Sequence, residues 1–288
     1  MRGLVPNYHM TTPATLAEAL GTLASEPGWT PFAGGTDLMV VMEAGRLPAD
    51  VKYLSLHRLD ELRGIEVDDA SIRFGALVTY RDVREHPIVR TELPMLAQAA
   101  KESGAIAIQN RGTLGGNIVN ASPAADSPPA LLAYGATLEL ASAAGSRRVA
   151  YEDFHQGYKV MDRRPDELLV AIHVPRRPRQ HHVYEKVGTR SYQAISKICL
   201  AATASVIDKK LVDVRIGLGA VAPTVVLAKA TMAVLEGASI EAPGLAARAC
   251  EAMGRDVRPI DDIRSTADYR RRVAQNLAAD LVVRLGGA

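Results

Sequence analysis

Two glycine-rich segments carry the residues of this chain best suited to binding an anionic ligand. The first, Ala33-Gly34-Gly35-Thr36-Asp37-Leu38, lies between an expected strand and an expected helix. Glycines let backbone N–H groups surround an anion without interference from a β-carbon, and a helix start adds partial positive charge. Thr36 could donate a hydroxyl hydrogen bond to a phosphate, whereas Asp37 would repel it and is expected to point away or to cap the helix. The segment therefore predicts a phosphate cradle, with an ordinary Gly-Gly turn as the alternative.

The second segment covers residues 111–128 and reads Arg-Gly-Thr-Leu-Gly-Gly-Asn-Ile-Val-Asn-Ala-Ser-Pro-Ala-Ala-Asp-Ser-Pro. Its density of glycines and small hydrogen-bonding residues predicts a long binding loop rather than a simple connector. The pair Gly115-Gly116 would admit a diphosphate close to the backbone. The side chains of Asn120, Ser122 and Asp126 could hydrogen-bond sugar or ribityl hydroxyls. Two such loops within one domain fit a dinucleotide.

Other patterns in the chain do not support a different chemistry. Residues 217–222 fit G-x-G-x-x-A after an expected strand, and Glu236 lies near the position of a ribose-binding acid. Pro223 follows the pattern at once, however, and Glu236 lies in a helical pattern rather than at the end of a second strand, so we expect no Rossmann site. The Walker A pattern and the G-x-S-x-G pattern are both absent, which removes the usual signatures of phosphoryl transfer and serine hydrolysis.

The cysteines and histidines argue against a metal centre held by this chain. Cys199 and Cys250 stand alone in apolar surroundings, which excludes an iron–sulfur cluster or a structural zinc bound through cysteine by this chain alone. We expect both to be buried thiols in a reducing compartment. The histidines are scattered, and the neighbours His181 and His182 would face opposite ways on a strand. Any redox chemistry therefore needs a carrier other than cysteine.

The composition is that of an ordinary globular chain. Its 288 residues have a formal net charge of +2, which gives no electrostatic reason to expect a nucleic-acid partner. The longest apolar stretch, residues 198–207, is far shorter than the ~20 residues that a membrane span needs. The amino terminus reaches Pro6 and polar side chains at once, so we expect no signal-peptide core and a cytoplasmic location.

Helices and strands alternate along the first half of the chain, around the two glycine segments. Spacing and start signals predict helices over 14–23, 38–44, 93–103 and 128–134, and strands over 30–33, 51–56, 71–74, 137–141 and 168–174. The basic, proline-rich run 175–182 is predicted to be a solvated linker and marks the expected domain boundary. Beyond it the pattern predicts a second α+β domain, with strands over 183–187, 199–207 and 212–218, then helices over 225–235, 245–254 and 266–285.

Together, the two glycine segments carry a resemblance to a known family. Residues 33–38 and 113–126 resemble the paired FAD-binding loops of the medium subunit of the xanthine dehydrogenase family of molybdenum hydroxylases, which includes the carbon monoxide dehydrogenase medium subunit. The spacing of the loops, the chain length and the domain order are also similar to that subunit. Residues 262–270, Asp-Ile-Arg-Ser-Thr-Ala-Asp-Tyr-Arg, resemble the start of its last helix. The resemblance covers essentially the whole chain.

The resemblance implies an α+β protein with two domains. The first, over 1–175, would be a FAD-binding domain of the vanillyl-alcohol oxidase (PCMH) type, with subdomains over about 1–57 and 58–175. The second, over 180–288, would be a smaller α+β domain built of an antiparallel sheet with helices. A noncovalently bound flavin would lie between them.

The resemblance also implies a set of FAD-binding residues and no catalytic or metal-binding ones. The first loop would hold the diphosphate through Ala33, Gly34, Gly35, Thr36, Asp37 and Leu38. The second would follow the phosphates, ribityl and ribose through Thr113, Gly116, Asn117, Asn120, Ser122 and Asp126. A third segment, from Lys186 to Ile198, would bring backbone and apolar groups to the isoalloxazine ring. It departs from the family pattern, because Ala194-Ile195-Ser196 stands where the family often has Asp before an Ile-Ala pair.

In function, the resemblance implies an electron-transfer subunit. A large subunit would hold the molybdenum cofactor and oxidise a purine, an N-heterocycle or an aldehyde, and a small subunit would hold two 2Fe–2S clusters. FAD on this chain would pass the electrons to an external acceptor, NAD or quinone, in a complex that is a dimer of heterotrimers. Two other classes stay open: a self-sufficient flavin-dependent oxidase or dehydrogenase, and a noncatalytic nucleotide-binding module.

Overall fold

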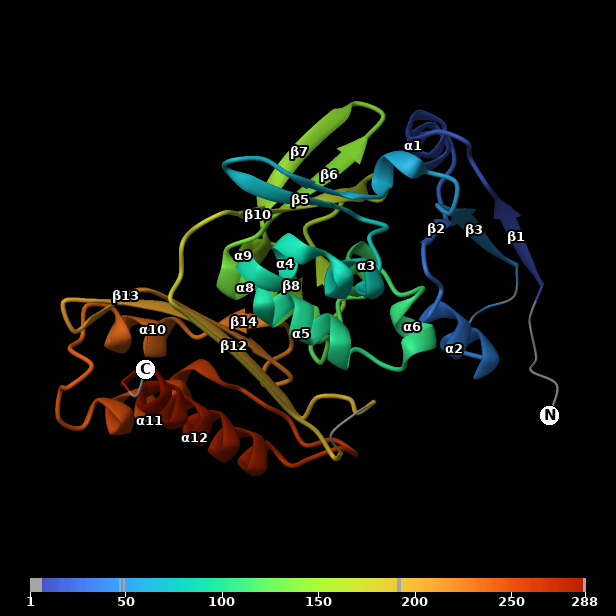
Figure 1. Ribbon diagram of the computed structural model, residues 1–288. Helices are drawn as coiled ribbons and strands as arrows, with labels where there is room; N and C mark the ends of the chain where they lie inside the picture. The colour runs from blue at the N-terminus through green and yellow to red at the C-terminus, as the bar shows by residue number, and fades with distance from the viewer. Residues whose placement is uncertain (1–6, 47, 49, 191–192, 287–288) are drawn as a thin grey trace.

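The amino-terminal elements form a small parallel sheet with helices beside it. The computed structural model describes residues 7–46, 48, 50–190 and 193–286. Strands β1 (Tyr8–Thr11), β3 (Val51–Ser55) and β2 (Trp29–Phe32) pair in parallel in that order, with helices α1 (Leu16–Ser25) and α2 (Leu38–Glu43) in the connections (Figure 1). Helix α1 begins later than the sequence predicts because Thr15 is its N-cap, with a hydroxyl that accepts from the Glu18 N–H. We call these elements the small subdomain.

The large subdomain follows, and it contains a five-stranded antiparallel sheet. The strand order is β4 (Ile65–Val67), β5 (Ser71–Gly75), β10 (Leu168–Pro175), β6 (Thr137–Ser142) and β7 (Gly145–Ala150). The helices of this subdomain are α3 (Tyr80–Glu85), α4 (Pro87–Glu92), α5 (Pro94–Glu102), α6 (Ile106–Gln109), α7 (Leu114–Val119), α8 (Ser127–Tyr134) and α9 (Tyr151–Phe154), and a 3₁₀ turn covers Asp60–Leu62. A short hairpin, β8 (His155–Gly157) and β9 (Val160–Met161), follows α9. Strand β10 is the last of the five in the sequence but occupies the middle of the sheet, so the sheet is complete only when residues 168–175 have joined it.

The C-terminal domain is an antiparallel sheet covered by helices on one face. Its strands pair in the order β11 (His181–Val187), β12 (Ile198–Ile207), β13 (Lys210–Gly219) and β14 (Val226–Leu227). Helices α10 (Lys229–Leu235), α11 (Leu245–Asp256) and α12 (Ala267–Gly286) come last, as predicted. One prediction is wrong: the helix expected over 225–235 begins only at Lys229, because Val226 and Leu227 pair with Leu218 and Gly217 as strand β14.

Strand β12 contributes to two hydrophobic cores at once. Its residues alternate between the faces of the sheet, so Ile198, Leu200 and Ala202 pack under the C-terminal helices while Cys199 and Ala201 join the core of the large subdomain. The prediction that both cysteines are buried holds for Cys199 only. Cys250 is half-buried, on α11.

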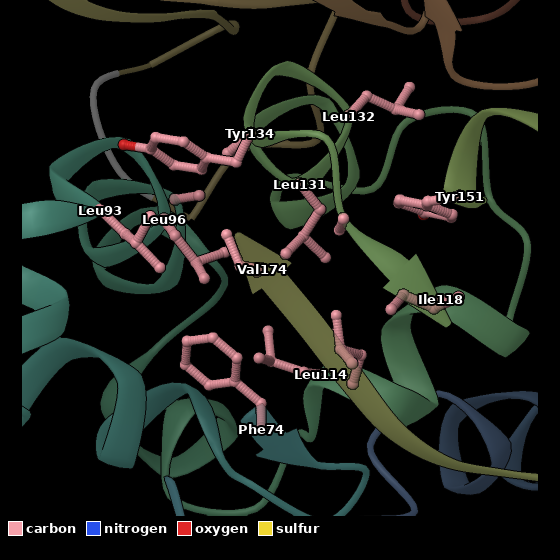
Figure 2. Close-up of a cluster of buried hydrophobic side chains, with 14 of the residues drawn as sticks. Phe74, Leu93, Leu96, Leu114, Ile118, Leu131, Leu132, Tyr134, Tyr151 and Val174 are labelled. Atoms are coloured by element: carbon pink, nitrogen blue, oxygen red, sulfur yellow. The ribbon is translucent and has the colours of Figure 1, made fainter. Parts of the chain in front are cut away.

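Helix α8 lies between the two sheets and is buried along its whole length. All eight of its residues are inaccessible, and it lies against β12 and β13 on one side and β10 on the other (Figure 1). Figure 2 shows its Leu131 and Tyr134 side chains gathered with Leu93, Leu96 and Val174 in the core. A residue in the left-handed conformation, Gly135, ends the helix. Because α8 begins directly after Asp126, its packing fixes where the second glycine segment ends.

Two arginines of the run predicted to be a solvated linker are packed and bonded, whereas Arg177 and Pro178 between them are exposed. The Arg176 guanidinium pairs with the Glu92 carboxylate at 2.7 Å and also donates to the Asp68 carbonyl. The Arg179 side chain is only 1% exposed and lies over the Tyr134 ring, 5.4 Å from its centroid. The arginines therefore attach the C-terminal domain to the large subdomain. None of the helices in the described part of the chain is long and apolar enough to span a membrane.

A dinucleotide-sized cavity with two glycine loops

A cavity of about 1110 Å³ lies where the small subdomain, the large subdomain and the C-terminal domain meet. Its walls are the β2–α2 loop, the segment around α7, the β8–β9 hairpin, the β11–β12 loop and the chain between α11 and α12. The predicted site residues that line it are Ala33, Gly34, Gly35, Thr36, Asp37, Leu38, Thr113, Gly116, Asn117, Asn120, Ser122 and Asp126. The structure thus brings the two glycine segments, far apart in sequence, to one site.

The first glycine loop presents free backbone donors to the cavity. Within the described residues, the N–H groups of residues 34–37 donate no hydrogen bond to a protein acceptor. Gly35 has a φ of +75°, a conformation that favours glycine, and a β-carbon there would lie 2.5 Å from the Phe32 ring. Asp37 occupies the N-cap position of α2 but makes no side-chain capping bond, so of the two expectations for this residue only that of a carboxylate pointing away stays open. The loop therefore has backbone N–H groups that are free to bind an anion, and its phosphate-binding role stays a prediction.

The second segment contains a short helix where the sequence predicts a long loop. Thr113 caps α7, and its hydroxyl accepts from the Gly116 N–H at 3.0 Å. The two glycines of the pair differ in surroundings. A β-carbon on Gly115 would lie 2.6 Å from the Ala76 carbonyl oxygen, so Gly115 allows α7 to pack closely on Ala76, and it also lines the cavity. On Gly116 a β-carbon would meet only the Thr113 hydroxyl, at 2.8 Å, because this residue faces the cavity.

Hydrogen bonds within the protein fix two amide side chains, that of Asn117 in α7 and that of Asn120 at its C-terminal end. The Asn117 side-chain oxygen accepts from the Ser127 hydroxyl at 2.5 Å. The Asn120 side-chain oxygen accepts from Lys159 Nζ at 2.8 Å, and the same ammonium bonds the Asn120 backbone oxygen. Lys159 lies on the β8–β9 turn, so this contact ties the hairpin to the cavity wall. With their oxygens occupied, both asparagines keep their NH₂ groups as donors for a ligand.

Asp126 joins the large subdomain to the C-terminal domain at the cavity wall. Its Oδ2 atom accepts from Lys186 Nζ at 2.8 Å, and its Oδ1 atom accepts from the Ser196 hydroxyl at 2.8 Å. The two charged side chains are 13% and 7% exposed. Burial raises the pKa of Asp126, and the neighbouring Lys186 ammonium opposes that rise. The carboxylate thus anchors the β11–β12 loop beside the cavity.

Two predicted site residues lie elsewhere than expected. Ile198 is fully buried under the C-terminal helices, because it begins β12 with its side chain on the face away from the cavity. Lys186 does not line the cavity, and its ammonium is bound to Asp126 and to the Glu102 carbonyl. The residues of this segment that line the cavity come from the loop between the two: Gln193, Ala194, Ile195 and Ser196.

Sequence reasoning missed the walls formed by later parts of the chain. Tyr158 of the β8–β9 turn is 66% exposed and lines the cavity. Ala220 and Ala222 line it too, although their segment was rejected as a dinucleotide motif. Between α11 and α12 the lining includes Arg258, Ile260, Asp262, Arg264 and, from α12, Arg270. Single residues at irregular spacing gave no signal, apart from the resemblance of residues 262–270 to a family segment.

Asp262 and Arg270 form an ion pair in this C-terminal wall. The Arg270 Nη2 atom lies 2.7 Å from Asp262 Oδ1, and the Arg270 side chain is 6% exposed. The hydrogen bond from Arg270, joined by backbone donors from Arg264 and Ser265, lowers the pKa of Asp262 to about 2. Asp262 is therefore an anion at neutral pH.

The residues present fit an elongated ligand with an anionic middle and an apolar planar end. The glycine loop supplies unpaired N–H donors, and the side-chain amides of Asn117 and Asn120 supply further donors. Apolar side chains complete the walls: Leu56, Leu77, Val119, Met161, Leu168 and Leu169. No cluster of three or more His, Cys, Asp or Glu side chains that could hold a metal ion occurs among the described residues. A dinucleotide with an aromatic head group has these properties.

A dinucleotide-sized cavity where two subdomains meet a separate α+β domain fits a flavin-binding oxidoreductase subunit. The FAD binding domain in molybdopterin dehydrogenase matches residues 6–177, and the CO dehydrogenase flavoprotein C-terminal domain matches residues 183–285. The chain therefore belongs to the family of FAD-binding medium subunits of xanthine dehydrogenase and CO dehydrogenase. This confirms the resemblance read from the two glycine loops.

Individual relatives are similar to this chain over nearly its full length. The xanthine dehydrogenase FAD-binding subunit of Escherichia coli O157:H7 is 32% identical over 282 residues, which are 96% of this chain and 94% of that subunit. The carbon monoxide dehydrogenase medium chain of Afipia carboxidovorans is 31% identical over 274 residues, 93% of this chain and 92% of that one. A solved carbon monoxide dehydrogenase from Hydrogenophaga pseudoflava superposes with a TM-score of 0.90 at 29% identity, over 97% and 96% of the two chains. The predicted α+β fold class is confirmed, and the chain is an oxidoreductase subunit with a FAD-binding domain.

Proposed function

We propose that this chain binds FAD noncovalently in the cavity and passes electrons from an iron–sulfur partner subunit to an external acceptor. The observation that carries the proposal is the meeting of both glycine loops with the C-terminal domain around one cavity of about 1110 Å³. FAD joins one-electron carriers to two-electron acceptors, which is the chemistry such a site supplies when it holds the cofactor.

The chain's own residues then have binding and positioning roles. The N–H groups of residues 34–37 hold the diphosphate, and the Gly116 surface lets it approach α7. Asn117 and Asn120 donate to ribityl and ribose hydroxyls. The β11–β12 loop, anchored by Asp126, closes the cavity beside the ring and keeps water away from it. No side chain is required to move a proton.

The other redox centres would belong to partner chains. We propose a large subunit with the molybdenum cofactor and a small subunit with two 2Fe–2S clusters, in a dimer of heterotrimers. The medium chains named among the relatives support this arrangement. Cys199 is fully buried in a core and Cys250 stands alone, so neither belongs to a cluster site. The substrate would be a purine, an N-heterocycle or an aldehyde, and the acceptor NAD or quinone.

The test is the flavin content of the purified complex and of one cavity variant. We expect the complex to release FAD on denaturation and to bleach reversibly with dithionite. Gly116→Leu should weaken FAD binding at least about tenfold, because its side chain would enter the cavity, while the partner subunits still co-purify with molybdenum and iron. Gly21→Leu is the control, since a β-carbon at this exposed glycine meets nothing within 4 Å. Full flavin content in Gly116→Leu, or a wild-type complex without flavin, would overturn the proposal.

A further inference from the structure

We propose that the C-terminal wall of the cavity holds a second anion subsite, made of Arg258, Arg264 and Arg270 together with Asp262, that binds the phosphates of a dinucleotide electron acceptor. The inference rests on the proposed function and extends it, because it selects a phosphate-bearing acceptor over a neutral quinone. All four side chains line the same cavity as the glycine loops. They come from the C-terminal domain, whereas the glycine loops belong to the two subdomains.

Arg270 is the buried member of the subsite. It is 5% exposed, and its Nη1 atom donates to the Ile260 carbonyl at 3.3 Å while Nη2 pairs with Asp262. Its Nε atom is buried and has no hydrogen-bond partner among the described residues. A buried guanidinium N–H without an acceptor is costly, and a ligand oxygen in the adjoining cavity would satisfy it.

Arg258 and Arg264 are the exposed members of the subsite. Arg264 is 39% exposed along its side chain and reaches Asp262 only at 3.5 Å. Arg258 is exposed, and its guanidinium makes no hydrogen bond or ion pair within the described part of the chain. Its backbone is fixed, however, because its N–H donates to the Val221 carbonyl at 2.8 Å. This wall thus contributes three guanidinium groups and one carboxylate to the cavity lining, which leaves a local excess of positive charge.

The pattern fits phosphate groups next to a planar, partly apolar head. Guanidinium groups bind phosphate oxygens in a bidentate manner, and charge-assisted bonds of this kind are the strong ones. Ile260 and Ile195, 68% and 53% exposed, lie on the cavity beside the cluster and offer an apolar surface for a ring. A neutral quinone would supply no anion to the Arg258 guanidinium or to the Nε atom of Arg270. With an oxidised nicotinamide as acceptor, one reduced flavin yields oxidised flavin, reduced nicotinamide and one proton, so the reaction balances.

The test compares a double variant with a matched control in the intact complex. Arg258→Gln/Arg264→Gln removes the two exposed charges, and Arg272→Gln removes one charge from the exposed face of α12, away from the cavity. Calorimetry with inorganic pyrophosphate should show binding to the wild-type complex that weakens at least about tenfold in the double variant. With NAD⁺ as acceptor, the KM should rise by a similar factor while kcat changes less than about twofold. The control should match the wild type in both measurements.

Three results would overturn the inference. If the double variant loses FAD while the wild-type complex retains it, the arginines belong to the flavin phosphates. If the affinity for pyrophosphate and the KM for NAD⁺ both stay at wild-type values in the double variant, the cluster only holds α12 in place. If the flavin-loaded wild-type complex neither binds pyrophosphate nor reduces NAD⁺, the acceptor is of another class. Because each of these results presupposes a wild-type complex that contains FAD, they are distinct from a failure of the proposed function.

Discussion

A β-carbon on Gly34 would lie 1.9 Å from the backbone carbonyl oxygen of Arg111, so the two glycine loops are packed backbone to backbone. The Arg111 Nε atom also donates to the Gly34 carbonyl at 3.3 Å. Glycine at position 34 therefore allows the small and large subdomains to pack closely together, while its neighbours present N–H groups to the cavity. The two loops form one cradle because this contact holds them together.

Gly34→Ala should separate the loops and weaken FAD binding. Overpacking of this kind costs about 1–3 kcal/mol of unfolding free energy. Because the displaced loop carries the free N–H donors, we also expect FAD affinity to fall at least about tenfold. Gly21→Ala is the matched control, because Gly21 lies in α1 with open space around it and alanine there should stabilise the helix by about 0.5–1 kcal/mol. Urea unfolding and fluorescence titration with FAD measure the two effects, and an unchanged FAD affinity in Gly34→Ala would contradict the packing argument.

Alanine at the adjacent positions 115 and 116 should have different effects. Gly115→Ala would place a β-carbon 2.6 Å from the Ala76 carbonyl, inside the fold, and should lower the unfolding free energy by about 1–3 kcal/mol. Gly116→Ala would meet only the Thr113 hydroxyl and project toward the cavity, so its main effect should be weaker FAD binding. Thermal melting and FAD titration of both variants distinguish the two roles. Equal effects of both variants on melting would show that Gly116 is also a packing residue.

Local sequence signals predicted the first glycine loop well because it is a continuous segment with its own backbone requirement. The strand, the two glycines and the helix of residues 30–43 are ordered as expected, and so are the strands and final helices of the C-terminal domain. Helix α7 was missed because its glycine pair indicates a loop, whereas the Thr113 cap and the packing of Gly115 on Ala76 favour a helix.

Contacts that depend on tertiary structure could not be predicted from local pattern. Ile198 and Cys199 are neighbours in an apolar run, and only the pairing of β12 decides which of them faces the C-terminal helices. Arg179 lies in a polar, proline-rich run, and nothing local shows that its side chain is covered by α8 and the C-terminal sheet. The residues of the C-terminal cavity wall could not be predicted from the sequence for the same reason.

Removing Lys186 should destabilise the contact between the domains. Lys186→Met leaves the Asp126 carboxylate buried without its cation, and the loss of one partner of a buried pair costs about 3–5 kcal/mol. The double variant Lys186→Met/Asp126→Asn removes both charges, so its cost should be smaller than the sum of the single costs by about 1–3 kcal/mol. Urea unfolding of the four proteins gives this coupling energy.

An exposed ion pair provides the control for this double-mutant cycle. The side chains of Lys209 and Glu241 are 70% and 64% exposed and lie 2.8 Å apart. Solvent screens such pairs, so the corresponding cycle with Lys209→Met and Glu241→Gln should give a coupling energy below about 1 kcal/mol. A value for Lys186 and Asp126 no larger than this would mean that the buried pair does not hold the domains together.

Two arginines of the run between the domains should differ strongly in their effect on stability. Arg179→Ala removes a buried guanidinium from the Tyr134 ring and from the Tyr134 carbonyl, and we expect a loss of about 2–4 kcal/mol from packing and hydrogen bonding together. Arg177→Ala changes an exposed side chain two residues away and should alter the unfolding free energy by less than about 0.5 kcal/mol. Similar melting temperatures for the two variants would show that this run is a solvated linker after all, as the sequence predicts.

Asp262→Asn should change how stability depends on pH in the acid range. In the folded chain, Arg270 holds the pKa of Asp262 at about 2, below its ordinary value of 3.8, so the pair stabilises the fold above pH 4 and loses this effect as the pH falls toward 2. At neutral pH the variant should be less stable by about 1–2 kcal/mol, a range reduced for solvent screening because the carboxylate is 26% exposed. The difference in unfolding free energy between wild type and variant should shrink between pH 4 and pH 2. The other carboxylates are present in both proteins, so their contributions to this difference cancel.

Asp280→Asn, on the exposed face of α12, serves as the control and should change stability by less than about 0.5 kcal/mol. A wild-type-to-variant difference that stays constant over this pH range would show that Asp262 is not held as an anion by Arg270.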